Sequence, residues 1–229
     1  MFVSIVAPAY NEEKAIRYYI SQVVSYMQTL KGYDWEFVVV NDGSSDDTGN
    51  ILQELKDIIP QLRVFNHEIN RGLGKALETG FAMAQGDIII TMDADGSHNP
   101  SVISSLLEKI KEADVAIASR YVFGGGMACK IPLYRRLSSL IGNEIMRRAL
   151  RWPVHDGTSG YRAYRKECVE HIKNLPAGFE VQVEILKRLK KSGKSFVEVP
   201  FILDNRIAGQ SKMVYWKLVK PYLTMCLHS

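Results

Sequence analysis

Cysteine and long apolar runs are scarce in this chain of 229 residues. Its three cysteines are odd in number and lack Cys-x-x-Cys spacing, so neither a disulfide framework nor a zinc site is indicated, and we expect a reducing compartment. The apolar start has no basic leader and meets the polar Asn11-Glu12-Glu13 within a few residues, which predicts a first strand and argues against a signal peptide. No apolar run approaches the length of a membrane span.

Two familiar nucleotide-binding patterns are also missing. No Gly-x-Gly-x-x-Gly follows the first apolar run, which argues against a dinucleotide-binding oxidoreductase. The segment Asn70–Lys75 places glycines and a lysine at an expected helix start, where free backbone N–H groups can receive a phosphate, although it lacks the full P-loop spacing. We therefore expect Lys75 to contribute to nucleotide binding without a P-loop.

Apolar runs and helical patterns alternate over the first 119 residues. Strands are predicted near 2–7, 35–40, 62–66, 87–92 and 114–118, and helices near 12–30, 46–58, 73–85 and 100–112. This alternation predicts an α/β fold with a mostly parallel central sheet and helices on both faces. With 46% apolar residues, the whole of 1–229 is expected to form a single domain.

The small net charge of +4 conceals an asymmetry between the two halves of the chain. Residues 1–119 hold 9 Lys and Arg against 17 Asp and Glu, a net charge of −8, whereas residues 120–229 hold 20 against 8, a net charge of +12. An acidic half suits a metal and nucleotide site, and a basic half needs an anionic partner, which nucleic acid or an anionic membrane surface could supply.

Two carboxylates, Asp93 and Asp95, directly follow the apolar run 87–92. The loops after parallel strands share one edge of the sheet, so we expect this pair to converge with the loops 8–12 and 41–46 in one crevice. Two like charges this close repel unless a cation lies between them, and hard oxygen ligands suit Mg²⁺ or Mn²⁺. The alternative is an ordinary strand-to-loop exit, in which Asp-x-Asp also occurs.

A basic amphipathic helix is predicted from Pro132 to about Trp152. Its apolar residues recur every four positions, at Leu133, Leu137, Ile141, Ile145 and Ala149. Its arginines are Arg135, Arg136, Arg147, Arg148 and Arg151. Such a helix could lie in a membrane interface, or it could pack on the sheet with a solvated basic face. The segment 212–220 mixes Trp, Tyr, apolar residues and Lys, which suits either an interfacial anchor or a docked terminal helix.

Seven motifs follow one another along nearly the whole chain. They are Pro8–Glu12, Val40–Asp46, Asn70–Gly74, Asp93–His98, Ser119–Tyr121, Asp156–Arg162 and Arg206–Lys212. With these motifs the chain resembles the inverting family-two glycosyltransferases of the A-type fold, a nucleotide-diphospho-sugar transferase fold. Among them it is similar to the dolichyl-phosphate mannose synthases and related polyprenyl-phosphate glycosyltransferases.

The resemblance implies roles for residues in the first half, 1–119. Pro8, Tyr10, Glu12, Asp42, Lys75 and Asp93 would bind the nucleotide. Asp93, Asp95 and Ser97 would hold Mg²⁺ or Mn²⁺, with the serine in contact through water. Family members usually carry Leu where Gly96 stands, which predicts a looser loop here. His98 follows the acidic pair, and we expect a structural role for it in preference to metal binding.

The resemblance also implies roles in the second half, 120–229. Arg120, Arg135 and Ser139 would meet the acceptor phosphate. Arg206, Ser211 and Lys212 would close over the diphosphate, and Asp95, Arg120, Arg206 and Lys212 would form the catalytic set. Displacing a nucleoside diphosphate requires neutralising its charge, which a divalent cation and basic side chains provide.

The implied reaction is metal-dependent, inverting transfer of a hexose, mannose from GDP-mannose in the first instance, to dolichyl or polyprenyl monophosphate. The enzyme would work at the cytoplasmic face of a membrane, attached at the surface or through an anchoring segment or subunit. UDP-glucose as donor, a sugar-nucleotidyltransferase and a non-catalytic nucleotide-sugar binding subunit are the alternatives. Nucleic acid is not expected as a partner, because apolar residues lie beside the arginines.

Overall fold

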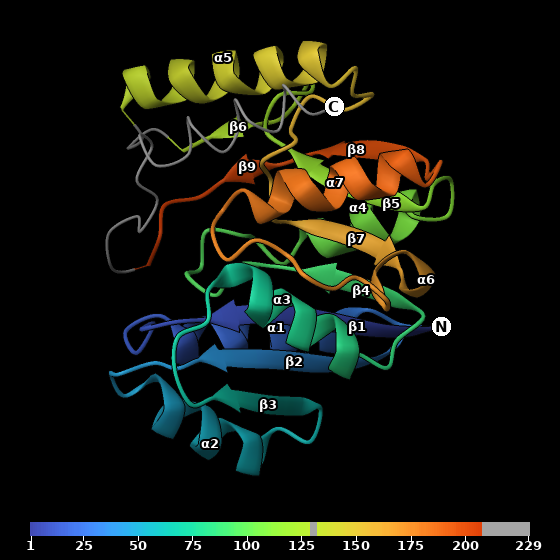
Figure 1. Ribbon diagram of the computed structural model, residues 1–229. Helices are drawn as coiled ribbons and strands as arrows, with labels where there is room; N and C mark the ends of the chain where they lie inside the picture. Colours follow the sequence, from blue (N-terminus) through green and yellow to red (C-terminus); the bar gives the residue numbers. More distant parts are fainter. Residues whose placement is uncertain (129–131, 208–229) are drawn as a thin grey trace.

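A seven-stranded sheet forms the centre of the protein (Figure 1). The computed structural model describes residues 1–128 and 132–207. The strands are β1 (Phe2–Ala9), β2 (Asp34–Asp42), β3 (Leu62–His67), β4 (Ile88–Thr91), β5 (Val115–Ser119), β7 (Arg162–Arg165) and β8 (Phe196–Pro200), in the order β3-β2-β1-β4-β7-β5-β8. Strand β7 runs antiparallel to β4 and β5, and the other neighbours are parallel, so the sheet is mostly parallel as predicted.

All five predicted strands are present, whereas the strands of the second half were not predicted from the sequence. Strand β7 is four residues long and begins and ends with arginine, so it lacks the apolar run that identifies a buried strand. Strands β6 (Gly126–Met127) and β9 (Ile202–Leu203) form a separate two-stranded sheet and are too short to leave a periodic pattern.

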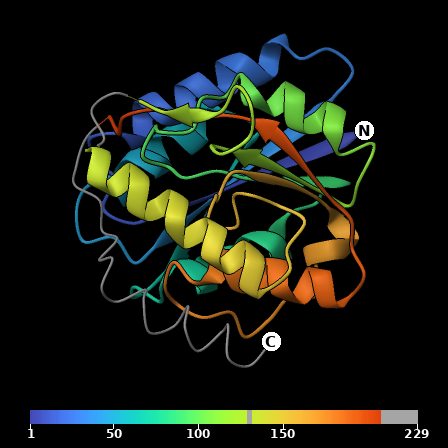
Figure 2. The same ribbon diagram turned by 90° about the horizontal axis from the view of Figure 1, so that it is seen from above.

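Helices cover both faces of the sheet, as Figure 2 shows from above. Helices α1 (Ile16–Thr29), α2 (Thr48–Ile58) and α4 (Val102–Lys109) contribute to the core on one face. Helices α3 (Leu73–Met83), α6 (Lys166–Val169) and α7 (Val181–Lys191) contribute to the core on the other. Val3 and Ile5 of β1 belong to the first core and Val6 to the second, because successive side chains of a strand point to opposite faces.

Helix α5 (Leu133–Ala149) lies across the end of the molecule beyond β8 (Figure 1). Its apolar stripe is exposed: Leu133, Leu137, Ile141 and Ile145 retain between 49% and 67% of their accessible surface. The helix contributes Met146 to the described core. The stripe therefore does not pack on the sheet within the described residues. In 1–128 and 132–207, none of the helices is long and apolar enough to cross a membrane.

Helix α3 approaches the sheet closely at Gly80. A Cβ atom at this position would stand 2.3 Å from Cγ1 of Val6 on β1, which is far inside van der Waals contact. Valine has little rotamer freedom, so it cannot turn away. Gly80 therefore permits the short distance between α3 and the sheet.

Two glycine-to-alanine substitutions should change stability in opposite directions. Gly80→Ala should lower the free energy of unfolding by about 1–3 kcal/mol, because the added methyl group overpacks the interface with Val6. Gly142→Ala, on α5 with no atom within 4 Å of the new Cβ, should raise it by about 0.5–1 kcal/mol through helix propensity. Urea denaturation followed by circular dichroism measures both, and equal effects would contradict the packing at Gly80.

Candidate active site

A cavity of about 340 Å³ opens at the carboxyl ends of β1, β2 and β4. Its walls include Pro8 at the end of β1, Tyr10 and Glu12 after it, Asp42 at the end of β2, Asp93–Asp95 after β4, Ala177–Phe179 before α7, and Arg206. The predicted convergence of the acidic loops in one crevice is thus confirmed, because parallel strands deliver their following loops to the same edge.

The loops after β1 and β2 are tied together by side chains. Asn11, with a left-handed φ of 53°, accepts a hydrogen bond from the Ser45 backbone N–H through Oδ1 at 2.8 Å. The Glu12 N–H donates to Oγ1 of Thr48 at 2.8 Å. Burial alone would raise the pKa of Asp46, but hydrogen bonds from Thr48 hold it below its usual value. These hydrogen bonds hold the loop after β1, which carries the cavity residue Glu12, against the start of α2.

Asp42 lines the cavity, yet its buried carboxylate is engaged within the protein. It accepts hydrogen bonds from the backbone N–H groups of Arg71 and Gly72, at 3.0 and 2.8 Å, and lies 2.6 Å from Nδ1 of His67. Gly72 has a left-handed φ of 87°, which glycine adopts without strain. Asp42 therefore holds the loop before α3 against the cavity, a role that sequence reasoning did not identify.

The two carboxylates of the acidic loop have different surroundings. The Asp93 side chain is 41% exposed to the cavity side, whereas that of Asp95 is 5% exposed. Asp95 Oδ1 accepts from the backbone N–H and the hydroxyl of Ser97, at 2.9 and 2.6 Å, and Oδ2 pairs with Nε of Arg206 at 3.0 Å. Burial and the neighbouring Asp95 raise the pKa of Asp93, against the opposing effects of His98 and Arg206.

This arrangement fits a divalent cation that is held together with a substrate. Asp93 and Asp95 bring hard oxygen donors to one cavity wall, where their mutual repulsion favours a bound cation. Among the described residues, no group of three or more His, Cys, Asp or Glu side chains could hold a metal ion. Mg²⁺ in proteins usually keeps several waters and binds substrate oxygens beside one or two carboxylates.

Ser97 differs from the expectation for a metal ligand. Its hydroxyl donates to Asp95, the residue is buried, and it does not line the cavity. The short serine side chain therefore orients the Asp95 carboxylate.

His98 holds the acidic loop, residues 93–95, through its backbone. Its Nδ1 accepts the backbone N–H of Asp93 at 3.0 Å, which orients the start of the loop. The ring is buried and stacks on Tyr161 at a centroid distance of 4.9 Å, with Phe201 against it edge-on. These contacts agree with the structural role expected for this histidine.

The segment 204–207 lies along the acidic loop. The N–H groups of Asp204 and Ile207 donate to the carbonyl oxygens of Ser97 and Asp95, both at 3.1 Å. Gly96 has a φ of 80°, and a Cβ there would stand 2.2 Å from Cδ1 of Ile207. The glycine lets Ile207 pack directly on the loop, next to the pair of Arg206 and Asp95. The looser loop expected at Gly96 stays a prediction.

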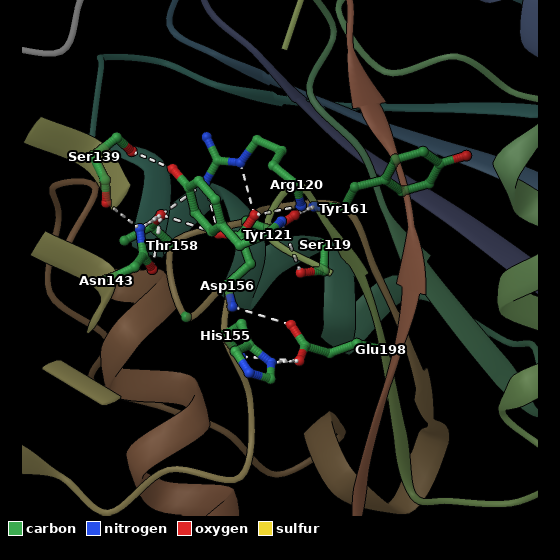
Figure 3. A network of polar contacts seen from close by, with 12 residues as sticks. Ser119, Arg120, Tyr121, Ser139, Asn143, His155, Asp156, Thr158, Tyr161 and Glu198 are labelled. Atoms are coloured by element: carbon green, nitrogen blue, oxygen red, sulfur yellow. Dashed lines mark hydrogen bonds and ion pairs between the residues drawn. The ribbon is translucent and has the colours of Figure 1, made fainter. Parts of the chain in front are cut away.

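A second polar cluster surrounds Arg120, at the end of β5 (Figure 3). Its Nε and Nη2 donate to the two carboxylate oxygens of Asp156 at 2.7 and 2.6 Å, and Nη2 also donates to Oγ1 of Thr158 at 2.8 Å. Asp156 is fully buried and Arg120 is 13% exposed. Burial alone would raise the pKa of Asp156, but the Arg120 guanidinium holds it below its usual value.

The cluster around Arg120 continues into α5 (Figure 3). Nδ2 of the buried Asn143 donates to Thr158 Oγ1 at 3.0 Å and to the Ser139 carbonyl at 2.9 Å. The Tyr121 hydroxyl donates to Ser139 Oγ at 2.6 Å. Ser139, expected at the acceptor phosphate, thus lies in the same network as Arg120.

Glu198 on β8 holds the other side of this cluster. Its Oε1 accepts the Asp156 N–H at 3.0 Å, and its Oε2 accepts the His155 N–H at 2.9 Å and lies 2.8 Å from His155 Nδ1. Sequence reasoning missed Glu198 because no motif surrounds it, and only the pairing of β8 with β5 brings it here.

Four other expected site residues have different outcomes. Lys75 does not line the cavity, and its Nζ lies 2.7 Å from Oε2 of Glu78, one helical turn away, so nucleotide binding by Lys75 stays a prediction. Arg135 lies in α5, but its side chain is outside the described part of the structure. Ser211 and Lys212 lie outside the described residues.

Comparison with known proteins identifies relatives over most of the chain. The family model described as Glycosyl transferase family 2 matches residues 4–173. Dolichol-phosphate mannosyltransferase from Pyrococcus furiosus is 40% identical over 216 residues, which cover 93% of this chain and 59% of that protein. Polyprenol monophosphomannose synthase from Mycolicibacterium smegmatis is 36% identical over 218 residues, which cover 91% of this chain and 80% of that protein.

Undecaprenyl-phosphate mannosyltransferase from Micrococcus luteus is 34% identical over 220 residues, 93% of this chain and 88% of that protein. Among solved structures, glucosyl-3-phosphoglycerate synthase from Mycobacterium tuberculosis, in complex with Mn²⁺, uridine diphosphate and glucosyl-3-phosphoglycerate, has a TM-score of 0.69 at 20% identity. The match covers 98% of this chain and 79% of the other. TarS 1–349 from S. aureus, in complex with UDP-GlcNAc, has a TM-score of 0.66 at 20% identity, covering 99% and 65%.

Removing the buried charge beside Arg120 should destabilise the protein. Asp156→Asn should lower the free energy of unfolding at pH 7 by about 2–4 kcal/mol, because a mostly buried guanidinium loses its carboxylate. The folded-state pKa of Asp156 is lowered, so its contribution is present above the ordinary aspartate pKa and is lost as the pH falls. Urea denaturation at several pH values should therefore show the difference from wild type narrowing below about pH 4.

An exposed ion pair serves as the control for Asp156→Asn. Arg17 and Glu54 form a pair whose side chains are 52% and 64% exposed. Glu54→Gln should change the free energy of unfolding by no more than about 0.5 kcal/mol. A similar loss in both variants would contradict a special role for burial at Asp156.

Proposed function

Because the chain belongs to glycosyl transferase family 2, we propose that it transfers a hexose from a nucleotide sugar to a polyprenyl or dolichyl monophosphate. The proposed donor is GDP-mannose and the sugar transferred is mannose, since three relatives at 34–40% identity are named for mannosyl transfer to such lipids. The observation that carries the proposal is the convergence of Asp93, Asp95 and Arg206 on one cavity.

The cavity supplies what a nucleotide-sugar site needs. Pro8, Tyr10 and Glu12 form a wall suited to the base and ribose, and Arg206 stands beside the acidic pair, where a diphosphate would come. When bound, Mg²⁺ or Mn²⁺ at Asp93 and Asp95 would offset the charge of the leaving diphosphate. Arg206 would then exchange its contact with Asp95 for a phosphate oxygen, a charge-assisted hydrogen bond of the same kind.

The acceptor side supports a reaction without a general base. A phosphate monoester has a second pKa near 6, so at pH 7 it is largely deprotonated and can attack directly. The buried carboxylate near this side, Asp156, is occupied by Arg120 and its pKa is lowered, so it orients the arginine and is not available to accept a proton. Arg120 would hold the acceptor phosphate, and in-line attack would invert the anomeric carbon.

Helix α5 supports attachment to a membrane surface. Its exposed apolar stripe could enter the acyl boundary, while the exposed Arg136 and Arg148 meet anionic head groups. The network of Thr158 and Asn143 connects this helix to Arg120, so the acceptor phosphate would reach the site beside the membrane. We place the reaction at the cytoplasmic face of a membrane as part of the proposal.

Loss of Asp95 should abolish metal-dependent transfer. Asp95→Ala should lower the rate by about 10²–10³-fold or more, because it removes both a metal ligand and the partner of Arg206. The assay follows radiolabelled sugar into the organic-extractable fraction from GDP-mannose, UDP-glucose or UDP-N-acetylglucosamine, with a polyprenyl phosphate and with or without Mg²⁺ or Mn²⁺.

The exposed Asp57→Ala on α2 is the matched control and should leave the rate unchanged. If label came from UDP-glucose and not from GDP-mannose, the proposed donor would be wrong and the proposed type of reaction would stand. Absence of label from every donor, with folded protein that binds nucleotide, would overturn the proposed reaction and leave a non-catalytic binding subunit.

Replacing the exposed stripe of α5 should weaken membrane binding. The double variant Leu137→Ser and Ile141→Ser removes two half-exposed apolar side chains, so its sedimentation with anionic liposomes should fall about tenfold or more. The thermal midpoint should change little, since neither side chain belongs to the described core.

The control for the liposome experiment changes two exposed isoleucines elsewhere. Ile58 and Ile69 are 70% and 71% exposed and lie outside α5. The double variant Ile58→Ser and Ile69→Ser should bind liposomes as the wild type does. Unchanged binding by the α5 variant would remove this helix from the proposed membrane surface.

A further inference from the structure

The side chain of Gln182 is buried with an unused acceptor. Gln182 is the second residue of α7 and is 5% exposed, and its Oε1 has no hydrogen-bond partner in the described part of the chain. An unsatisfied buried polar group destabilises the folded state, so its presence calls for an explanation. Leucine would fill similar space without this cost.

The amide lies beside the acidic loop. A Cβ on Gly160 would stand 3.1 Å from Gln182 Nε2 and 3.3 Å from Asp93 Oδ1, so both polar groups flank the space above this glycine. The φ of Gly160 is not in the left-handed region, so its backbone does not require glycine. The missing side chain instead keeps open the space between the amide and the carboxylate.

This space adjoins the candidate donor cavity. Asp93 lines that cavity, and so does Gly178, which lies one helical turn before Gln182. The backbone of Gln182 is fixed, because Nη1 of the fully buried Arg162 donates to its carbonyl at 2.9 Å. The neighbours Val181 and Val183 are completely buried, and the amide lies behind Asp93, which lines the cavity.

The chemistry of these two groups selects a hydroxyl. A carboxylate accepts hydrogen bonds, whereas an amide both donates and accepts. A hydroxyl group can accept from Nε2 of Gln182, the amide atom that faces this space, and donate to Asp93 at once, which neither a phosphate oxygen nor an apolar group can do. Sugar rings carry several such groups, and the nucleotide part of a donor would lie against the other wall, at Pro8 and Tyr10.

We propose that Gln182, with Asp93 opposite, binds a ring hydroxyl of the donor sugar and thereby contributes to the choice of sugar. The inference rests on the proposed function, since it takes the cavity to be a nucleotide-sugar site. Gln182 acts on the sugar and not on the nucleotide, so its removal affects recognition of the complete donor and leaves nucleotide binding intact.

Calorimetric titration with GDP and with GDP-mannose, in the presence of Mn²⁺, separates the two parts of the donor. Gln182→Leu should weaken binding of GDP-mannose about tenfold or more and that of GDP less than about twofold, because one hydrogen-bonded hydroxyl is lost. Its thermal midpoint should stay the same or rise, since the variant removes an unsatisfied acceptor. The exposed Gln53→Leu on α2 should match the wild type in both titrations.

Gly160→Ala supplies an independent variant. Its methyl group enters the space between Gln182 and Asp93 and should also weaken the binding of GDP-mannose more than the binding of GDP. Deoxy analogues of GDP-mannose identify the hydroxyl: the analogue that lacks it should bind wild type and Gln182→Leu equally.

Three outcomes would overturn the inference. Equal dissociation constants for GDP-mannose in wild type and Gln182→Leu would overturn the role of Gln182 and leave the proposed function standing. An equal loss of affinity for GDP and GDP-mannose in Gln182→Leu would do the same. Wild-type protein that binds neither GDP-mannose nor UDP-glucose would overturn the proposed function together with it.

Discussion

The repulsion between Asp93 and Asp95 is the constraint on which the rest of the site depends. Two carboxylates at one edge of a parallel sheet can be kept close only if positive charge or donors surround them. The protein supplies Arg206 and the Ser97 hydroxyl to Asp95, and positions Asp93 through His98. In the proposed function, a cation and a diphosphate would take over these contacts.

The contact of Arg206 with Asp95 also ties the end of the described chain to the site. The segment 204–207 is held by backbone hydrogen bonds to the acidic loop, and Ile207 occupies the room left by Gly96. Elsewhere in the protein, hydrogen bonds through Thr158 and Asn143 connect the buried pair of Arg120 and Asp156 to α5.

Much of the first half was predictable because its signals are local. Buried parallel strands are continuous apolar runs, and the loops that follow them carry the acidic motifs, so both the strands and the convergence of Asp93 and Asp95 with Glu12 followed from the sequence. The second half was less predictable. Strand β7 is short and ends in arginines, and its place between β4 and β5 comes from pairing across more than forty residues of chain.

The sequence by itself determined the fold class, the acidic cavity edge and the charge difference between the halves, since these depend on local pattern and on chain order. Tertiary structure decided which side chains are free to act. Lys75 is taken by Glu78, Asp42 by the loop before α3, and Asp156 by Arg120. It also left the side-chain Oε1 of Gln182 buried without a hydrogen-bond partner among the described residues. A hydrogen bond depends on distances of a few ångströms between residues far apart in sequence, and only the packed structure sets those distances.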